Sequence, residues 1–563
     1  MLIWRKLIKE SSNQKLIQLL FVITLLIVGV FFFFRPTITS GFKNMQSDPG
    51  DTLFNNYILE HSYRSVFDES YEVSVWSPEF FYPQRNVLSY GDNLWGAAPF
   101  YWLARVFLPP DTSFQAWMIL MVIFNFLAFY FLARQLKINT WIAAITAFIF
   151  IIGLPRMGQF SHQQLMPQFF SFLSLLFLFR FINNRKFYNL LIFEGLLYLQ
   201  MLSSIYLGWL FIFSLAIFIP ANLIYHRNKE LIKSFFSLQV IASYVVLLFI
   251  LLITFRPYYL AQQELGKWRY EGVSKMIPQA ASYFSFAADN ILYNLYPKAM
   301  LAVSNKLPMS WEHHLFLGFF PILLLAVSVI SFIMIKRRES LNVKWPPLFI
   351  ISLITFVVLT SISLQFKIID YSFWRNIYDY FPGAGGIRVV TRIWLVSYLF
   401  LFLGTASLTS YVYEKTKRKD IKVILLIVGL LACLEQINVR PSYFNKLEHR
   451  RLQLEMDTSI AEALSKKQVD AFYLRWVLED EPFYRYQLMA MWSGLNLQVP
   501  TVNGYSGKRP VGYQDISVAM TDDSLVSWID YKRPGDLKNI LVFEARVKES
   551  QWFFLKNYNL IIP

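Results

Sequence analysis

The chain has 563 residues, of which 55% are hydrophobic, 18% aromatic and only 16% charged. A chain this long and this apolar does not fit one soluble core and is typical of a polytopic membrane protein. The net charge of +16 does not indicate nucleic-acid binding, because Lys and Arg occur in short clusters between apolar runs. The single cysteine, Cys433, excludes an intrachain disulfide, and no spaced Cys/His set indicates zinc.

Eleven apolar stretches predict membrane-spanning helices, since about 20 residues at 1.5 Å each cross a hydrocarbon core of roughly 30 Å. The first stretch is interpreted as a retained helix and not a signal peptide, because Arg35 and Pro36 follow it without a small-residue cleavage site. The third, fifth and last are short, and if the last does not cross, the carboxyl-terminal tail lies in the cytoplasm. The predicted spans are 16–34, 114–132, 141–154, 165–182, 187–202, 206–224, 235–253, 315–335, 347–364, 393–412 and 423–434.

Basic residues cluster at every second connection between these stretches, and short basic loops stay cytoplasmic. This pattern predicts a cytoplasmic amino terminus and, with an odd number of spans, an extracytoplasmic carboxyl terminus. The resulting organisation is a transmembrane module over 1–437, with outer loops over 35–113 and 254–314, and an extracytoplasmic domain over 438–563. The basic clusters lie around 5–15, 134–137, 185–186, 227–233, 336–338 and 415–422.

The outer segments are rich in aromatic residues, which disordered linkers avoid. The run 77–83 and the later Trp95, Trp102 and Phe107 predict interfacial helices with rings at headgroup depth. The tail combines strand-like runs at 471–474 and 540–543 with a helical stretch at 458–465, which predicts a small α/β domain. Inside the fifth span, Glu194 is costly to bury and should face the bundle or a wet cavity.

Two carboxylates open the first outer loop. Asp48 and Asp51 flank Pro49-Gly50, a dipeptide that favours a tight turn, so both can lie near the outer end of the first helix. A pair like this can serve as a general base or a cation site. The alternative is structural, because Asp51 precedes 52–59 and an aspartate there often caps a helix.

Short motifs are spread along most of the chain. In chain order they are Gly50-Asp51-Thr52, Phe81-Tyr82-Pro83, Asp92, Gly158-Gln159-Phe160-Ser161-His162, Leu315-Phe316-Leu317-Gly318, Phe381-Pro382-Gly383, Ile387-Arg388-Val389 and Asn503-Gly504-Tyr505-Ser506-Gly507. With these motifs the chain resembles bacterial members of the GT-C superfamily of integral-membrane glycosyltransferases, which use lipid-phosphate-linked sugars.

In that superfamily the first outer loop supplies a catalytic aspartate, and the matching positions here are Asp51 and, second, Asp48. The family often has two adjacent acids, whereas two residues separate these, so the acting carboxylate and the role of a metal stay open. A lone carboxylate pair is an incomplete metal site, so no metal or other cofactor is expected, with a divalent cation at the pair as the alternative.

A lipid phosphate needs cations near the membrane boundary, and bidentate Arg suits it better than Lys. Arg388 and Arg392 are four residues apart and would share a helical face. Their alternative role is interfacial snorkelling, and for the histidines it is that of satisfied polar residues. The predicted donor-phosphate ligands are Arg388, Arg392, His162, Arg156, His313 and His314, and the substrate-binding candidates are Asp92 and Tyr505.

The sequence therefore predicts a GT-C-type glycosyltransferase of a bacterial cytoplasmic membrane. It would transfer a sugar from a polyprenyl-phosphate carrier to a hydroxyl of a lipid, glycan or protein on the outer face, with Asp51 as general base. Membrane lipids, the lipid-linked sugar and the acceptor are the expected partners. The alternatives are a lipid-linked glycan flippase or polysaccharide transporter without catalysis, and a membrane scaffold whose tail recruits partners. The large outer mass favours the enzyme, because a transporter needs little of it.

Overall fold

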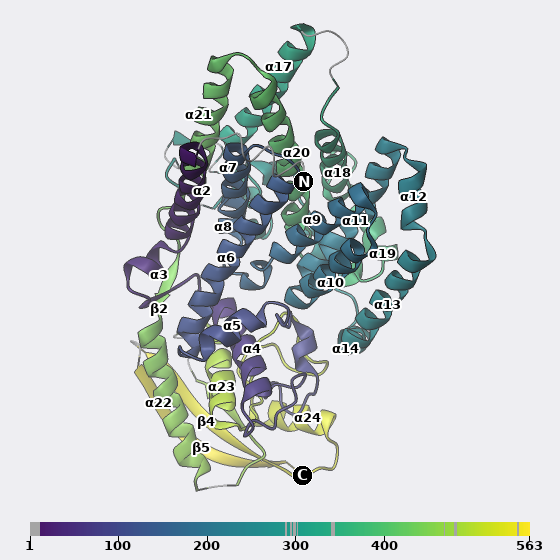
Figure 1. Cartoon of the computed structure of the whole chain (residues 1–563). Coiled ribbons are helices and arrows are strands. Elements are labelled where there is room, and N and C mark those ends of the chain that lie inside the picture. Colours follow the sequence, from purple (N-terminus) through teal and green to yellow (C-terminus); the bar gives the residue numbers. More distant parts are fainter. Residues whose placement is uncertain are drawn as a thin grey trace.

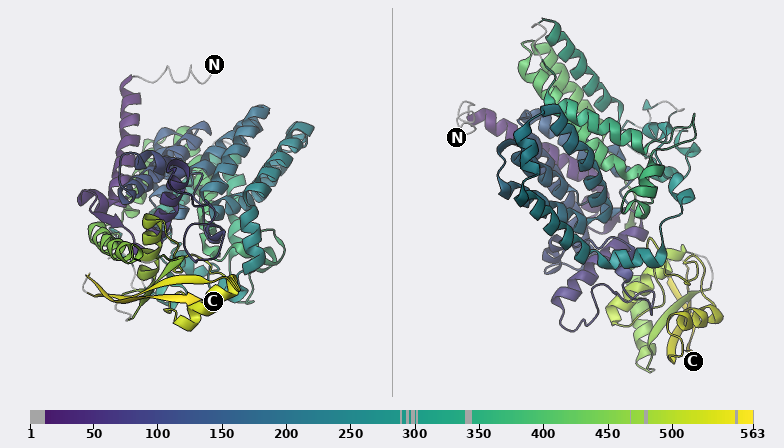
Figure 2. Two further views of the ribbon diagram at one scale, coloured as in Figure 1. Left: turned by 90° about the horizontal axis from the view of Figure 1, so that it is seen from below. Right: turned by 90° about the vertical axis from the view of Figure 1, so that its right-hand side faces the viewer.

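A bundle of apolar helices with a small sheet at one end makes up the computed structural model of the chain (Figure 1). The C-terminal sheet lies at the opposite end from the turn between α20 and α21 (Figures 1 and 2). The structure describes residues 12–287, 290–292, 295–296, 300, 302–338, 344–466, 468–477, 481–548 and 551–562.

Each of the eleven predicted spans coincides with a helix. By length and composition, seven helical segments of the described chain suffice to cross a membrane, or up to eight if the bent pair α12 and α13 is one span. Those seven comprise α2, α6, α7 with α8, η2 with α9, α11, α17, and η8 with α20. The prediction of eleven spans is thus confirmed only in part, because α10, α18 and α21, with 17 residues each, are shorter than the others. The bundle helices are α2 (Ser12–Phe33), α6 (Pro110–Gln135), α7 (Thr140–Ile151), α8 (Leu154–Gly158), η2 (Gln163–Leu165), α9 (Phe169–Asn184), α10 (Phe187–Ser203), α11 (Ile205–His226), α12 (Lys229–Phe235), α13 (Leu238–Thr254), α17 (Phe319–Arg338), α18 (Pro347–Ser363), α20 (Trp394–Lys415) and α21 (Lys419–Glu435).

Burial differs sharply along this bundle. Helix α20 is almost entirely buried, and Gly404 lets it approach α18 so closely that a Cβ there would lie 3.2 Å from Ser352 Cβ. Helix α13 instead exposes large apolar side chains such as Phe249 and Leu252, each more than 60% exposed. An exposed apolar face of that kind is typical of a helix that contacts lipid or a protein partner. Glu194 of α10 faces inward and accepts a hydrogen bond from Ser243 of α13, as its predicted inward position requires.

The loop over 35–113, here called the first long loop, consists mostly of buried and half-buried residues. The run 77–83 is not the predicted interfacial helix, since its chain forms bends and ends at a cis Tyr82–Pro83 bond. Of the other predicted interfacial residues, Trp102 lies in the helix α5 (Ala98–Arg105) and Phe107 follows it. Leu103 and Phe107 are exposed there, so this helix stays a candidate for the interface. The elements of this loop are α3 (Arg35–Thr39), β1 (Asn44–Gln46), α4 (Pro49–Phe67), η1 (Val87–Tyr90) and α5 (Ala98–Arg105).

Two further loops lie between bundle helices and consist of short helices. The first follows α13 and leads to α17, and the second connects α18 to α20. Their elements are α14 (Arg256–Leu265), α15 (Tyr270–Ser274), η3 (Ala280–Phe284), η5 (Ser304–Lys306), η6 (Ser310–Glu312), α19 (Trp374–Tyr380), η7 (Ala384–Gly386) and η8 (Val390–Ile393).

The segment after α21 forms a three-stranded sheet with helices around it. Strand β3 pairs in parallel with β4, and β4 pairs antiparallel with β5. The strand-like runs 471–474 and 540–543 lie within β3 and β4, and the helical run 458–465 mostly within α22. The boundary at 437 and the placement of this segment outside the membrane stay predictions. The elements are β2 (Tyr443–Asn445), α22 (Lys446–Leu464), β3 (Ala471–Trp476), α23 (Phe483–Leu497), α24 (Asp522–Lys532), β4 (Lys538–Lys548) and β5 (Gln551–Ile562).

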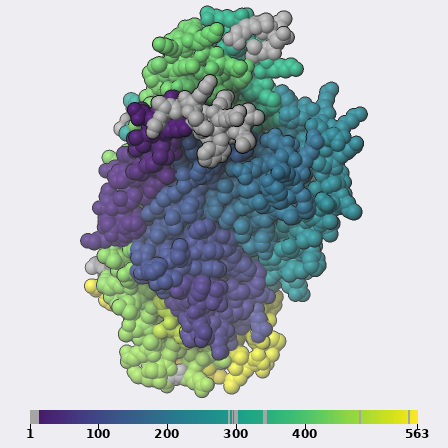
Figure 3. Space-filling model, viewed as in Figure 1, coloured from purple at the N-terminus to yellow at the C-terminus, as the bar shows by residue number. Residues whose placement is uncertain are grey.

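The C-terminal segment adjoins the first long loop on the face shown in Figure 3. Strand β1 pairs antiparallel with β2, and α23 packs against α4, where the Trp492 indole N–H donates to Leu53 O. The backbone N–H of Phe81 donates to Asn503 O at 2.9 Å. These bonds bring the loop after α23 to the start of α4, more than 400 residues earlier in the chain.

Candidate active site

The two carboxylates of the first long loop have different roles at the start of α4. Asp48 is the N-cap residue, and its Oδ1 accepts a hydrogen bond from the Gly50 backbone N–H at 2.8 Å. Asp51 lies in the first turn, where the helix dipole favours a negative charge. The alternative in which Asp51 caps a helix over 52–59 is therefore wrong by three residues, because Pro49 starts the helix earlier. Asp51 is left free to bind other groups.

Asp51 accepts one hydrogen bond on each oxygen. The His162 Nδ1–H donates to Oδ2 at 2.8 Å, and the Tyr505 hydroxyl donates to Oδ1 at 2.8 Å. The Asp51 side chain is nevertheless 25% exposed, so lone pairs stay open to a ligand. Tyr505 was predicted to bind substrate and His162 to bind phosphate, whereas the structure places both on the carboxylate.

Local packing explains how Tyr505 reaches α4. A Cβ on Gly504 would lie 2.3 Å from the Phe81 ring, so only glycine allows this approach. The buried Asn503 side chain bonds to both Leu474 N and Leu474 O, which ties the segment to β3. The motif around 503–507 thus forms a fixed turn that delivers the Tyr505 hydroxyl.

A second carboxylate and a guanidinium extend the site behind His162. Glu312 of η6 lies 3.3 Å from His162 Nε2 and accepts a hydrogen bond from Arg392 Nη2 at 2.9 Å. The Glu312 and Arg392 side chains are only 5% and 8% exposed. Arg392 also stacks over the Tyr206 ring, whose hydroxyl accepts from the Val389 N–H. The contacts therefore run from Asp51 to His162, Glu312 and Arg392, so that carboxylates alternate with groups that can carry a positive charge.

The contacts between these groups shift the pKa values of Asp51, His162 and Glu312, which lie outside the membrane spans. Burial alone would raise the pKa of Asp51, but the hydrogen bond and charge of His162 outweigh it, and the Asp51 pKa is lowered. Burial and the nearby Arg392 oppose protonation of His162, yet its bonds to Asp51 and Glu312 raise its pKa. For Glu312, Arg392 and His162 overcome burial and hold its pKa well below its ordinary value. These shifts favour the ionised form of both carboxylates and the protonated form of His162.

The pKa of Asp48 shifts in the opposite direction to that of Asp51. Burial and the charge of Asp51 raise its pKa, with the Gly50 N–H bond acting against them. Of the two acids, Asp51 is the one kept ionised by dedicated partners.

Two cations without carboxylate partners in the described chain are close in sequence to residues of this centre, Arg388 to Arg392 and Lys508 to Tyr505. Arg388 stacks over the Trp268 ring at 4.9 Å, and Lys508 lies 5.2 Å from the centre of the same ring. Within the described part of the chain neither forms an ion pair; Lys508 Nζ donates to Gly266 O. The predicted helical face shared by Arg388 and Arg392 is wrong, because the chain at Arg388 is not helical and only Arg392 lies in η8.

The predicted phosphate ligands His313 and His314 offer no free positive charge to a phosphate. His313 uses both ring nitrogens, on Ser282 Oγ and on Lys275 O. His314 lies against Gly158, and burial with the neighbouring His313 lowers its pKa to about 4. A neutral imidazole of this kind adds no charge for a phosphate.

Arg156 and Asp92 have structural partners. Arg156 is buried, stacks over Trp394 and donates to Gln168 Oε1 at 2.6 Å. Asp92 accepts from the Ile205 N–H at the start of α11, and burial raises its pKa to about 6. Its position fits a helix-capping role better than substrate binding.

Glu312, Lys508 and Trp268 were not predicted from sequence. Glu312 directly precedes the His pair in the loop before α17, and Lys508 directly follows the motif around Tyr505. Either neighbourhood could have drawn attention to them. Among the residues that the structure describes, no group of three or more His, Cys, Asp or Glu side chains could hold a metal ion.

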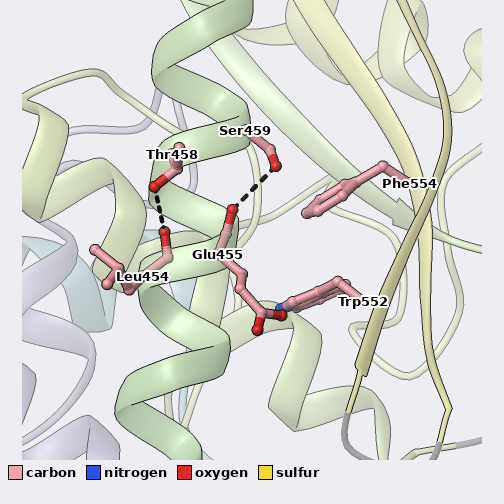
Figure 4. Close-up of a pocket in the computed structure, with 6 residues that line it drawn as sticks. All are labelled: Leu454, Glu455, Thr458, Ser459, Trp552 and Phe554. Carbon is pink, nitrogen blue, oxygen red and sulfur yellow. Dashed lines mark hydrogen bonds between the residues drawn. The ribbon is translucent and has the colours of Figure 1, made fainter.

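Two hollows of the surface lie apart from this centre. A groove of about 410 Å³ runs between α22 and β5, with Trp552 and Phe554 facing Glu455 across it (Figure 4). Its polar groups have partners within the chain, such as Arg451 for Glu455. A second hollow of about 490 Å³ lies beside Trp76 and Arg256. Neither is lined by Asp51 or its partners.

The fold and this centre define a multi-pass helical membrane protein with a partly buried acid–imidazole site between its bundle, its first long loop and its C-terminal segment. The chain belongs to the family described as "Domain of unknown function (DUF6311)", which matches residues 8–436. A comparison with curated proteins finds no match.

Eleven chains of solved structures match this fold. One is the crystal structure of ArnT from Cupriavidus metallidurans in the apo state, with 10% sequence identity and a TM-score of 0.39. The match covers 96% of this chain and 98% of that one.

Proposed function

We propose that this protein is a membrane glycosyltransferase that transfers a sugar from a polyprenyl-phosphate carrier to a hydroxyl acceptor. Asp51 acts as the general base, and Arg388 and Lys508 bind the phosphate of the donor. The reaction takes place at the outer face of a bacterial cytoplasmic membrane, where the alternation of basic loops puts the first long loop. The sequence resemblance to the GT-C superfamily gives the reaction class, and the geometry supports the residue roles.

The observation that carries the proposal is the state of Asp51. Its carboxylate is ionised, held by two hydrogen bonds and still 25% exposed. An acceptor hydroxyl can donate to a remaining lone pair of Asp51. A general base needs this contact, at about 2.6–3.2 Å between heavy atoms, before its pKa matters.

The proposed step balances without a further reactant. The acceptor oxygen forms a bond to the anomeric carbon while the bond from that carbon to the phosphate oxygen breaks. The phosphate leaves with the electron pair, and the hydroxyl proton passes to Asp51. Because the hydroxyl becomes acidic only as its oxygen bonds to carbon, a carboxylate of low pKa can still accept this late proton.

Arg388 and Lys508 suit the leaving phosphate because no carboxylate of the described chain neutralises them. Their ammonium and guanidinium groups would stabilise the negative charge that grows as the sugar departs. Arg392 was predicted for this role, but Glu312 already pairs with it at 2.9 Å.

The C-terminal segment would complete the site. It provides Tyr505, which contacts Asp51, and Lys508, three residues further on. A site closed by this segment excludes water, which favours transfer over hydrolysis of the donor.

The test is transfer from a panel of radiolabelled polyprenyl-phosphate sugars to membrane acceptors. Wild-type protein is compared with Asp51→Asn at matched expression, and Asp48→Asn is the control because asparagine caps a helix as well as aspartate. We expect Asp51→Asn to lose about 10²- to 10⁴-fold in rate with donor binding retained, and Asp48→Asn to stay near wild type. Full activity of Asp51→Asn would reject Asp51 as the base. No turnover of any donor by the wild type would favour a lipid-linked glycan transporter.

A further inference from the structure

Glu312 is the one group of the centre that contacts both of its cations. Its Oε1 accepts from Arg392 at 2.9 Å and lies 3.3 Å from His162 Nε2. The side chain is 5% exposed, so water contributes little to these bonds. It does not contact Asp51, and any effect on the reaction must pass through His162.

We propose that Glu312 is a positioning residue that keeps His162 doubly protonated and aimed at Asp51. The proposal rests on the proposed function for its catalytic meaning, but the charge of His162 can be measured without any substrate. In this proposal His162 acts as a fixed cation and not as a phosphate ligand or a general base.

The neighbours of His162 indicate which of its ring nitrogens carry protons. A carboxylate only accepts hydrogen bonds, so a ring nitrogen that bonds to one must carry a proton. His162 has a carboxylate at each nitrogen, Asp51 at Nδ1 and Glu312 at Nε2. The 2.8 Å hydrogen bond at Nδ1 and the 3.3 Å contact at Nε2 fit the imidazolium, which carries a proton on each nitrogen.

The surrounding charges show why Glu312 is needed. The groups that face His162 are Asp51 of α4, Glu312 of η6 and Arg392 of η8, with Tyr505 and Tyr206 beyond Asp51 and Arg392. Arg392 repels a proton on His162, and burial opposes it as well. Without Glu312, Asp51 alone would have to offset both, so the imidazolium depends on the second carboxylate.

An imidazolium at this place has a defined use. It fixes one oxygen of Asp51 and keeps that carboxylate ionised, so that the acceptor proton meets a base in one orientation. With His162 neutral, Nδ1 could lose its proton, and the bond to Asp51 Oδ2 would be lost in that tautomer.

The test measures the protonation of His162 in the full-length protein in detergent or nanodiscs. Diethyl pyrocarbonate modifies neutral imidazole, so the pH dependence of labelling at His162, followed by mass spectrometry, gives its titration midpoint. The exposed His226 in the same sample is the internal reference. We expect Glu312→Gln, which is close to isosteric, to lower the His162 midpoint by about one pH unit or more, or about tenfold in labelling at fixed pH.

A second variant distinguishes charge from general damage. Arg392→Gln removes the repulsive cation and frees Glu312 for His162, so the midpoint should rise instead of fall. Opposite shifts in the two variants support the proposal, whereas an unchanged midpoint in folded Glu312→Gln, or equal shifts in both, would overturn it. If sugar transfer is also found, its pH profile should narrow in Glu312→Gln; absence of transfer would reject the proposed function and leave the labelling result standing.

Discussion

Removal of the two cations around Trp268 should weaken binding of a lipid phosphate without affecting an uncharged lipid. The variants are Arg388→Gln, Lys508→Gln and the double variant. Each side chain lies about 5 Å from the same indole ring, and neither has a carboxylate partner in the described chain. Both are half-buried, so a phosphate bound between them would be shielded from bulk water.

The magnitude follows from one charged contact per side chain. A hydrogen bond to a charged group contributes about 1.5–3 kcal/mol, and 1.4 kcal/mol is about tenfold in affinity. Each single variant should therefore bind the donor about 10- to 100-fold more weakly. The double variant should lose less than the product of the two, because residues that share a partner are not additive.

The assay is equilibrium binding of a radiolabelled polyprenyl phosphate to protein in nanodiscs, with the matching polyprenol as uncharged ligand. Lys532→Gln is a matched control, since Lys532 also lies over an indole, that of Trp528, but is paired with Glu264 at 2.9 Å. An unchanged affinity in the double variant, or an equal loss in Lys532→Gln or with polyprenol, would refute the assignment.

Two further predictions concern stability. Glu60→Ala should destabilise the protein, because the buried Glu60 carboxylate accepts hydrogen bonds from Arg64, Arg105 and Tyr101. We expect a loss of about 3 kcal/mol, the lower end for breaking a buried ion pair, since both guanidinium groups are partly exposed. Thermal unfolding in detergent measures this, and a loss of equal size in the exposed Glu69→Ala would contradict it. Burial raises the pKa of Glu79 to about 7, so the folded protein retains a proton that the unfolded chain releases near its ordinary pKa of 4.5. Stability should therefore fall as the pH rises between these values and level off above about 7, and this fall should be smaller in Glu79→Gln; identical pH profiles for the two proteins would count against the buried acid.

The helices were accessible from sequence because each depends on local composition. An apolar run long enough to cross a membrane is helical in almost any context, since its backbone groups must be satisfied internally. The strands at 471–474 and 540–543 were predicted for a similar reason, as short β-branched and aromatic runs. The prediction for the run 77–83 was wrong. Its aromatic residues indicated an interfacial helix, but Pro78 and Pro83 prevent a regular helix there.

The candidate site, unlike the helices, could be predicted from the sequence only in part. Asp51 stood out because a turn dipeptide separates it from Asp48, and the helix start then selected Asp51 over Asp48. The same local pattern could not distinguish the histidines, although only His162 contacts a carboxylate of the centre through a ring nitrogen. His313 uses its nitrogens on Ser282 and a backbone carbonyl.

The sequence by itself determined an apolar helical protein, the carboxylate pair that opens its first long loop and the turn that carries Tyr505. Only the tertiary structure decided that these meet. Asp51 and His162 are 111 residues apart, and Asp51 and Tyr505 are 454 apart, so no periodicity or spacing connects them. Charge and protonation in the centre depend on distance in space, and Glu312 and Lys508 acquire their roles only where the chain folds back on α4.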